Sequence, residues 1–336
     1  MKKLLVVMFV MMLGLALAQE FTLKMGYFLP EQAAVPANFL NPWAEKIMEE
    51  SGGRIKIDIY PSSQLTPPPA IYDGIKDGVM DIGWGLPGYT PGRFPISEVF
   101  ELPFIAGKAE ATSQAAWEFY DHHLREEFGD VYMIVFHVHG PGLFHIKGKP
   151  VTDLFSLAGR AIRAPTRSMN LALELIGAEP IGMPVPQVPE AISRGVIEGT
   201  VLPYEVTTSL KLSELVDSHT SFEGNRAMYT STFFFAMNKD VYDRLPDDLK
   251  AIIDQNSGLE ASKWAGIAMD EGDVVGLEAA QASGNEFYSF TEAEREQWIS
   301  ATQPVVDGWV EMMNGAGLDG EALLQEAKDL IAKYEQ

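Results

Sequence analysis

Residues 157–205 read LAGRAIRAPTRSMNLALELIGAEPIGMPVPQVPEAISRGVIEGTVLPYE, with short apolar strand patterns and amphipathic helix patterns in turn. Proline and glycine punctuate the stretch at the points where one pattern gives way to the next. Strands that alternate with helices are typical of a parallel α/β sheet. The predicted elements are a strand at 161–164, a helix at 166–176, a strand at 179–183, a helix at 188–194 and a strand at 198–202.

Arg163 is the candidate binding residue of this stretch. It lies near the end of an apolar strand at 161–164 that Pro165 stops, and a helix pattern opens just after that proline. A guanidinium fork matches the two oxygens of a carboxylate, and a helix N-terminus adds backbone N–H groups beside it. Its neighbours Ile162 and Ala164 are apolar, which distinguishes it from basic residues on solvated surface. We therefore expect Arg163 to bind an anion.

The rest of the chain continues the alternation on both sides. Strands are predicted at 21–28, 55–60, 80–85, 131–139, 144–147, 228–237 and 285–290, and helices at 43–50, 70–77, 110–127, 291–314 and 318–333. The helical pattern from Pro246 to about Ala282 is interrupted only near Gly258. As one helix of about 36 residues it would reach about 54 Å, long enough to brace two lobes.

Two lobes are predicted from the breaks in the pattern. Gly140-Pro141-Gly142 marks the first crossing between them, and a polar stretch before the 228–237 run marks the return. We assign residues 19–140 plus 228–265 to the first lobe, and residues 141–227 plus 266–336, with the terminal helices, to the second.

Aromatic residues gather where the predicted strands end. Ligand crevices in such sheets lie beyond the carboxyl ends of the strands, and small-molecule pockets are mostly apolar with a few placed polar groups. The aromatic residues at this rim are Tyr27, Phe28, Trp84, Tyr89 and Tyr204. Together with Arg163, Arg93 and Phe234, they are predicted to bind the ligand.

The N-terminus and the composition narrow the function class. Two lysines, an apolar run from Leu4 and the Ala16-Leu17-Ala18 site predict a cleavable signal peptide over residues 1–18, cut before Gln19, and an exported mature chain. The formal net charge is −22, and −24 once that segment is removed. Such acidity disfavours nucleic acid and anionic membrane surfaces as partners, and no later run is long enough for membrane insertion. The absence of cysteine excludes disulfides and thiolate chemistry.

Motifs for catalysis and cofactors are weak. Residues 83–88 match G-x-G-x-x-G, but Pro87 and Pro91 forbid the helix that a dinucleotide site needs. His137 and His139 share a strand face and could form a zinc pair, although no further ligand motif accompanies them, so we favour histidines satisfied within the strand. No cofactor and no metal are therefore predicted. Acidic residues are abundant, so a hydrolase that uses a carboxylate pair stays as an alternative.

Several segments together resemble the periplasmic solute receptors of TRAP transporters (tripartite ATP-independent periplasmic transporters, DctP type). They occur in the family's order over essentially the whole mature chain. The matching segments are residues 89–95, 159–165, 176–184, 194–199 and 237–239, with Leu245-Pro246.

The resemblance implies a two-lobed periplasmic binding protein fold with a cleft between the lobes and a long lobe-spanning helix. It further implies a non-enzymatic receptor that closes on an organic acid and delivers it to a small and a large membrane subunit driven by an ion gradient. In the family the arginine equivalent to Arg163 clamps the carboxylate. Many members have an asparagine that also binds the ligand where this chain has Leu202, so the resemblance implies Leu202 as a further binding residue. This departure points to a monocarboxylate such as a 2-oxo, aliphatic or aromatic acid. A receptor that presents its ligand to a sensor kinase is the other alternative.

Overall fold

The chain folds around two mixed β-sheets, which the computed structural model describes over residues 19–336. The first sheet has the order β2-β1-β3-β10-β4, and the second has the order β11-β9-β5-β8-β6-β7. The first sheet is made of β1 (Phe21–Tyr27), β2 (Ile55–Tyr60), β3 (Ile82–Gly85), β4 (Val131–Val138) and β10 (Thr232–Asn238). The second is made of β5 (Leu143–Ile146), β6 (Ala161–Ala164), β7 (Glu179–Gly182), β8 (Gly199–Leu202), β9 (Ser218–Phe222) and β11 (Glu286–Phe290).

Each sheet contains one strand that runs against its neighbours. β10 pairs antiparallel with β3 and β4, and β5 pairs antiparallel with β8 and β9. β5 is the first strand that the chain forms in the second sheet, and β10 is the strand with which it returns to the first. The α/β fold with two lobes is confirmed, and the parallel pairing expected from the alternation holds for the other strand pairs but not for those of β5 and β10.

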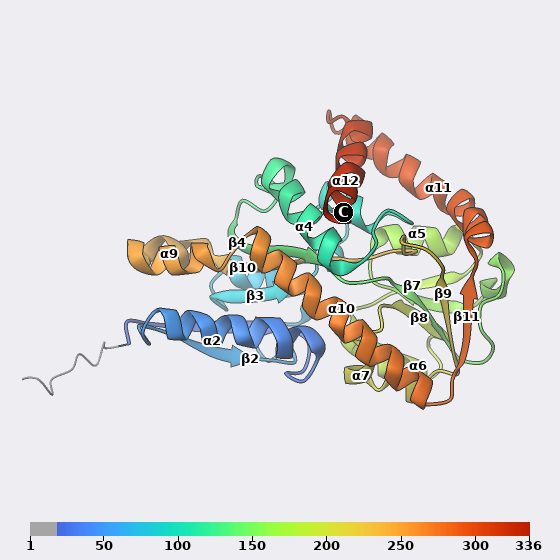
Figure 1. The fold of residues 1–336 in the computed structure, drawn as a ribbon, viewed down its shortest axis with the longest axis horizontal. Coiled ribbons are helices and arrows are strands. Elements are labelled where there is room, and N and C mark those ends of the chain that lie inside the picture. The colour runs from blue at the N-terminus through green and yellow to red at the C-terminus, as the bar shows by residue number, and fades with distance from the viewer. Residues whose placement is uncertain (1–18) are drawn as a thin grey trace, which may run out of the picture.

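Helices cover the faces and outer edges of both sheets (Figure 1). The helices near the first sheet are α2 (Asn41–Glu50), α3 (Ile71–Lys76), α4 (Ala109–Phe119), α8 (Lys239–Arg244) and α9 (Asp247–Gln255). Those near the second are α5 (Arg167–Leu175), α6 (Val188–Ser193), α7 (Thr207–Leu210) and α11 (Glu292–Gly315). Two more helices link the halves, namely α10 (Leu259–Ala282) and α12 (Gly320–Tyr334).

Helix α10 crosses the molecule diagonally from the first sheet's side to the second's (Figure 1). It is separated from α9, because Gly258 adopts a φ of 90° and breaks the helix between Gln255 and Leu259. The expected single helix of about 36 residues is therefore wrong, and the 24 residues of α10 extend about 36 Å. At Gly266 its backbone lies against the carbonyl of Ala109, and at Gly276 against that of Tyr204. Neither contact leaves room for a side chain, so glycine lets α10 lie close to both halves.

The C-terminal helix α12 packs on α4, beside the first sheet. Glu118 of α4 accepts hydrogen bonds from Lys333 and Tyr334, and Arg226 pairs with Glu335 nearby. Helix α11 instead lies beside α5 on the second half. The residue ranges assigned above to each lobe stay a prediction.

In the described part of the chain, no helix combines the length and apolar character needed to cross a membrane. The predicted signal peptide, residues 1–18, lies outside the described residues.

Candidate functional site

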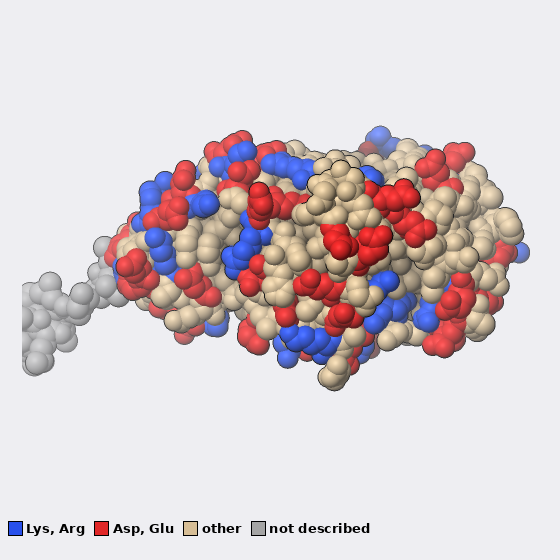
Figure 2. Space-filling view, turned by 90° about the horizontal axis from the view of Figure 1, so that it is seen from above, with Lys and Arg blue, Asp and Glu red and all other residues tan. Residues whose placement is uncertain are grey.

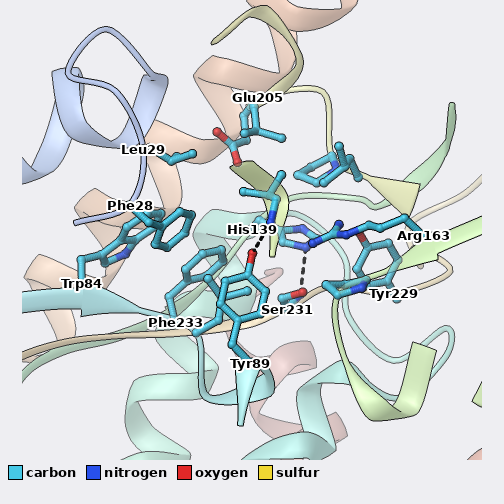
Figure 3. Close-up of a pocket in the computed structure, with 16 residues that line it drawn as sticks. Phe28, Leu29, Trp84, Tyr89, His139, Arg163, Glu205, Tyr229, Ser231 and Phe233 are labelled. Atoms are coloured by element: carbon cyan, nitrogen blue, oxygen red, sulfur yellow. Dashed lines mark hydrogen bonds between the residues drawn. The ribbon is translucent and has the colours of Figure 1, made fainter. Parts of the chain in front are cut away.

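One pocket lies where the strand ends of the two sheets face each other (Figure 3), and the space between its protein atoms, counting the part open to solvent, is about 340 Å³. A position beyond the strand ends and between two halves of a protein is typical of a small-molecule site. From the first sheet come residues after β1, β3 and β4 and at the start of β10. From the second come residues at or after the ends of β6, β7 and β8. The lining residues are Phe28, Leu29, Trp84, Leu86, Tyr89, His139, Arg163, Pro165, Val185, Leu202, Pro203, Glu205, Val206, Tyr229, Ser231 and Phe233.

The first sheet contributes a stack of aromatic rings. Phe28 lies 4.7 Å from Trp84 between ring centroids with an interplanar angle of 13°, and Trp84 lies 4.8 Å from Phe233 at 4°. Tyr89 meets Phe28 edge-on at 5.9 Å. Trp84 also donates its Nε1–H to His137 Nε2 at 2.9 Å, so its polar atom is satisfied inside the sheet. These faces form a flat, apolar wall.

The second sheet contributes Arg163, whose side chain is only 1% exposed. Its Nε donates to the Met183 carbonyl at 2.9 Å, and its Nη1 donates to the Val201 carbonyl at 3.2 Å. Residue 163 lies between β7 and β8 in the sheet, so carbonyls near the ends of the two flanking strands hold the guanidinium. No ion pair with Arg163 occurs among residues 19–336, and its Nη2 keeps hydrogen-bonding capacity for a ligand.

His139 adds a buried neutral ring at the base of the pocket. Its Nδ1 lies 2.6 Å from the Gly140 carbonyl oxygen, to which it donates, and its Nε2 accepts from the Ser231 N–H at 3.0 Å. Burial lowers the pKa of His139 to about 3, so the ring carries no charge at neutral pH. Both ring nitrogens form hydrogen bonds within the chain, so His139 stabilises the segment around Gly140 where the chain passes from the first sheet to the second.

Three buried polar atoms of the pocket lack a hydrogen-bond partner within the described chain. They are Glu205 Oε2, the Tyr229 hydroxyl and Ser231 Oγ. Burial, with a smaller contribution from Asp273, raises the pKa of Glu205 to about 8, so its carboxyl is mostly neutral at pH 7. Buried polar groups without partners are uncommon in proteins, and here all three face one cavity.

Five of the predicted binding residues line this pocket, namely Phe28, Trp84, Tyr89, Arg163 and Leu202. Arg163 and Leu202 come from adjacent regions of the second sheet, whereas the three aromatic residues come from the first half of the chain. The structure therefore brings the candidate cation and the aromatic residues together.

The other four predicted residues lie outside this lining and contact other parts of the chain. The Tyr27 hydroxyl donates to Asn41 at 2.9 Å, because successive residues at the end of β1 point to opposite faces. Arg93 pairs with Asp73 at 2.8 Å and lies over the Tyr72 ring. Phe234 packs on Tyr72 on the far side of β10, and the ring of Tyr204 packs edge-on against His145.

Sequence reasoning did not select several of the lining residues. Phe233 belongs to the apolar run that was recognised, but the face of β10 on which it lies could not be fixed without the strand register. Tyr229, Ser231 and Glu205 follow or precede strands, and a search for polar residues at strand ends, rather than aromatic ones alone, would have included them. Val185 and Val206 carry no distinguishing signal.

Histidines and acids that could hold a metal lie away from this pocket. His137 is bonded to Trp84, and His145 contacts His219 at 2.7 Å between their Nδ1 atoms. In the described residues, one group has metal-ligand geometry, formed by His122, His123 and Glu326. Glu326 of α12 lies within hydrogen-bond distance of both rings, at 2.7 and 2.8 Å. This group links α12 to the turn after α4 and does not contact the pocket.

Residues 25–313 match the family model described as bacterial extracellular solute-binding protein, family 7. A TRAP solute binding protein from Rhodoferax ferrireducens T118, crystallised with copurified benzoate, is 46% identical with a TM-score of 0.91, covering 94% of this chain and 98% of that one. A marine metagenome TRAP solute binding protein specific for aromatic acid ligands, in complex with 3-hydroxybenzoate, is 42% identical with a TM-score of 0.92, covering 95% and 100%. The outer membrane transporter protein TsaT of Comamonas testosteroni is 27% identical, over 91% of this chain and 90% of its own length.

Proposed function

The chain belongs to the bacterial extracellular solute-binding proteins of family 7 and is a TRAP-type receptor for an organic acid, and on this premise we propose that its ligand is an aromatic monocarboxylate. The receptor captures this acid in the periplasm and passes it to the small and large membrane subunits of its transporter. Both steps follow the family, whereas the ligand class rests on the pocket.

The observation that carries the proposal is the unpaired, buried guanidinium of Arg163 in an apolar pocket. Burying a charge without a partner is costly, and natural proteins pair such groups. Because no carboxylate in residues 19–336 forms an ion pair with Arg163, an anionic ligand is the natural counter-ion. One cation with one free edge suits one carboxylate, which favours a monocarboxylate over a diacid.

The aromatic wall supports the proposal that the ligand is an aromatic acid. Phe28, Trp84 and Phe233 present near-parallel faces, and a planar ring packs on such faces by offset stacking. Leu202, at the position where many members of the family have asparagine, removes a polar contact from the opposite side. The relatives crystallised with benzoate and 3-hydroxybenzoate agree with this chemistry.

Binding by both walls also explains how a ligand would favour closure of the cleft. A ligand shifts a conformational equilibrium only through its different affinities for the two states. A carboxylate on Arg163 of the second sheet and a ring on Phe28 and Trp84 of the first would contact both halves only when they are close. The closed state therefore binds more tightly and becomes populated.

The test is a ligand panel on protein that has been unfolded and refolded to remove copurified acids. Calorimetry would compare benzoate, phenylacetate and 3-hydroxybenzoate with pyruvate, hexanoate and succinate, and thermal shift would check the order, since a ligand of the native state raises the melting temperature. We expect one or more aromatic monocarboxylates to bind at least tenfold more tightly than the others. Tighter binding of succinate or of an aliphatic acid would overturn the proposal.

The same samples address the alternatives. Ligand recovered unchanged after incubation is expected of a receptor, whereas conversion to a product would favour the secreted hydrolase. Loss of ligand uptake in a strain that lacks the gene is expected of transport, and unchanged uptake with lost transcriptional response would favour delivery to a sensor kinase.

A further inference from the structure

The pocket is lined by a carboxyl group that carboxylate binding by Arg163 does not use, namely that of Glu205. Glu205 lies between β8 and α7, is 3% exposed and has no partner for its Oε2 within the described chain. Its backbone N–H donates to Asp273 Oδ1 of α10 at 2.8 Å. Gly272 of α10 lets the helix lie against the Glu205 Cβ. These contacts fix the backbone and leave the carboxyl directed into the cavity.

Glu205 and Arg163 approach the cavity from different sides. In Figure 3 the Glu205 carboxyl lies above the pocket on the side of Leu29 and Phe28, whereas Arg163 enters from the opposite side next to Tyr229. No ion pair joins Glu205 to Arg163 in residues 19–336, so the glutamate does not neutralise the cation. A ring whose carboxylate binds Arg163 would therefore carry its other edge toward Glu205.

The electrostatic state of Glu205 suits an uncharged polar group. Desolvation raises its pKa to about 8, and the nearby carboxyl of Asp273 adds to this effect. A neutral carboxyl offers both an O–H donor and a carbonyl acceptor, and a phenolic hydroxyl is complementary to both. An apolar ring edge at this position would leave the buried Oε2 without a partner, which costs binding free energy.

We propose that Glu205 is a specificity-determining residue whose carboxyl hydrogen-bonds a ring hydroxyl of the ligand, so that the receptor selects hydroxylated aromatic acids over unsubstituted ones. This rests on the proposed function, because it places an aromatic carboxylate on Arg163. Sites built to bond a substrate hydroxyl discriminate strongly against the analogue that lacks it, whereas apolar pockets discriminate weakly. Tyr229 lies beside Arg163 in Figure 3, so its hydroxyl is better placed than Glu205 to hydrogen-bond the carboxylate of the ligand.

The experiment measures how the benefit of the hydroxyl depends on Glu205. Calorimetry on refolded full-length mature protein would determine Kd for benzoate, 3-hydroxybenzoate, 4-hydroxybenzoate and the size control 3-methylbenzoate, with wild type, Glu205→Leu and Glu205→Gln. Glu174→Gln, an exposed glutamate on α5, is the matched control. In wild type and in the control, we expect at least one hydroxybenzoate to bind tenfold or more tightly than benzoate and 3-methylbenzoate.

In Glu205→Leu the preference should fall to twofold or less, while benzoate binds as tightly as in wild type or more so. Glu205→Gln keeps the shape and a polar head and should retain part of the preference, which tests the role if the leucine variant does not fold. A purely structural role would weaken all four ligands equally and would overturn the inference, as would a wild-type preference below twofold. If no aromatic acid binds wild type at all, the proposed function itself fails, which is a distinguishable result.

Discussion

The aromatic stack that the first sheet contributes to the pocket and the charged wall of the second, with Arg163 and Glu205, differ in how well their polar atoms are satisfied. Phe28, Trp84 and Phe233 stack on one another, and the indole N–H of Trp84 is already bonded to His137. On the other wall, Arg163 has no ion pair and Glu205 Oε2 has no partner in residues 19–336. The aromatic stack is complete without a ligand, whereas Arg163 and Glu205 gain partners only with one, as do the hydroxyls of Tyr229 and Ser231 that precede β10.

Because of this difference, we expect the charged wall to determine how tightly a ligand binds and the aromatic wall to determine which ligand shape is preferred. Interactions with a desolvated charge are strong and directional, so the second wall should supply most of the binding free energy. The aromatic wall provides apolar contact area and planar faces, which contribute a smaller binding free energy and favour a flat ligand. The surface seen from above gives no hint of an anion site, because acidic side chains are spread over that face with basic ones among them (Figure 2). The decisive cation is buried.

The largest effect is expected from Arg163→Ala. Removing the charged partner of a desolvated carboxylate should cost about 2–4 kcal/mol of binding, or roughly 30- to 1,000-fold in Kd. Calorimetry with the tightest aromatic acid of the panel measures it. Arg160→Ala removes an arginine that pairs with Glu198 outside the pocket and should bind normally. Binding by Arg163→Ala within twofold of wild type would refute the assignment of the two walls.

Much of the charged wall was predictable because its signal is local. Arg163 follows two apolar strand residues and lies two positions before Pro165, so its element and its end of the sheet are both set by neighbours in sequence. Phe28 and Trp84 were found in the same way, from the ends of β1 and β3. The α/β class and most element boundaries also come from local periodicity and turn residues.

The predicted residues that lie outside the pocket lining, and the lining residues that were not predicted, depend on long-range pairing. Phe233 lies on the pocket face and Phe234 on the opposite face, because neighbouring strand residues alternate and only the pairing of β10 with β3 and β4 fixes which is which. Strand β9, with the polar sequence SHTSF, has no apolar alternation and forms by pairing with β5 and β11. Glu205 becomes special only when α10 buries it.

Gly276→Ala is expected to have the next largest effect, because α10 joins the two walls. A Cβ there would collide with the Tyr204 carbonyl, displacing the segment that carries Leu202 and Glu205. Overpacking of this kind should destabilise by about 1–3 kcal/mol, measured by urea unfolding, and should weaken ligand binding as well. Gly308→Ala in α11 faces open space and should stabilise by about 0.5–1 kcal/mol. Equal behaviour of the two variants would mean that α10 does not position the charged wall.

Asp273→Asn tests the buried acids behind that wall. Desolvation, with a smaller effect from Asp270, raises the pKa of Asp273 to about 7. Between its unfolded pKa near 4 and pH 7, the folded state keeps a proton that the unfolded state has lost, so this group lowers stability as pH rises, by up to about 1.4 kcal/mol per pH unit. The loss is complete above pH 7.

The asparagine variant keeps an oxygen that accepts from the Glu205 N–H but cannot titrate. Its free energy of unfolding, measured with urea at pH 5, 6 and 7, should therefore fall less steeply with pH than that of wild type. Glu271→Gln, on the exposed side of the same helix, should leave the slope unchanged. A slope for Asp273→Asn as steep as that of wild type would show that the other buried acids alone set the pH response.

The smallest effect is expected from Phe28→Leu, which removes one ring of the first wall and keeps its apolar character. Stacked aromatic pairs contribute about 0.5–1.5 kcal/mol beyond buried area, so binding of an aromatic acid should weaken roughly 2- to 12-fold. Binding of cyclohexanecarboxylate, which has a similar size but no π face, should change less than twofold, because Arg163 still holds its carboxylate. Equal losses for the two acids would show that the first wall contributes area alone, and that ring selection comes from the side of Glu205.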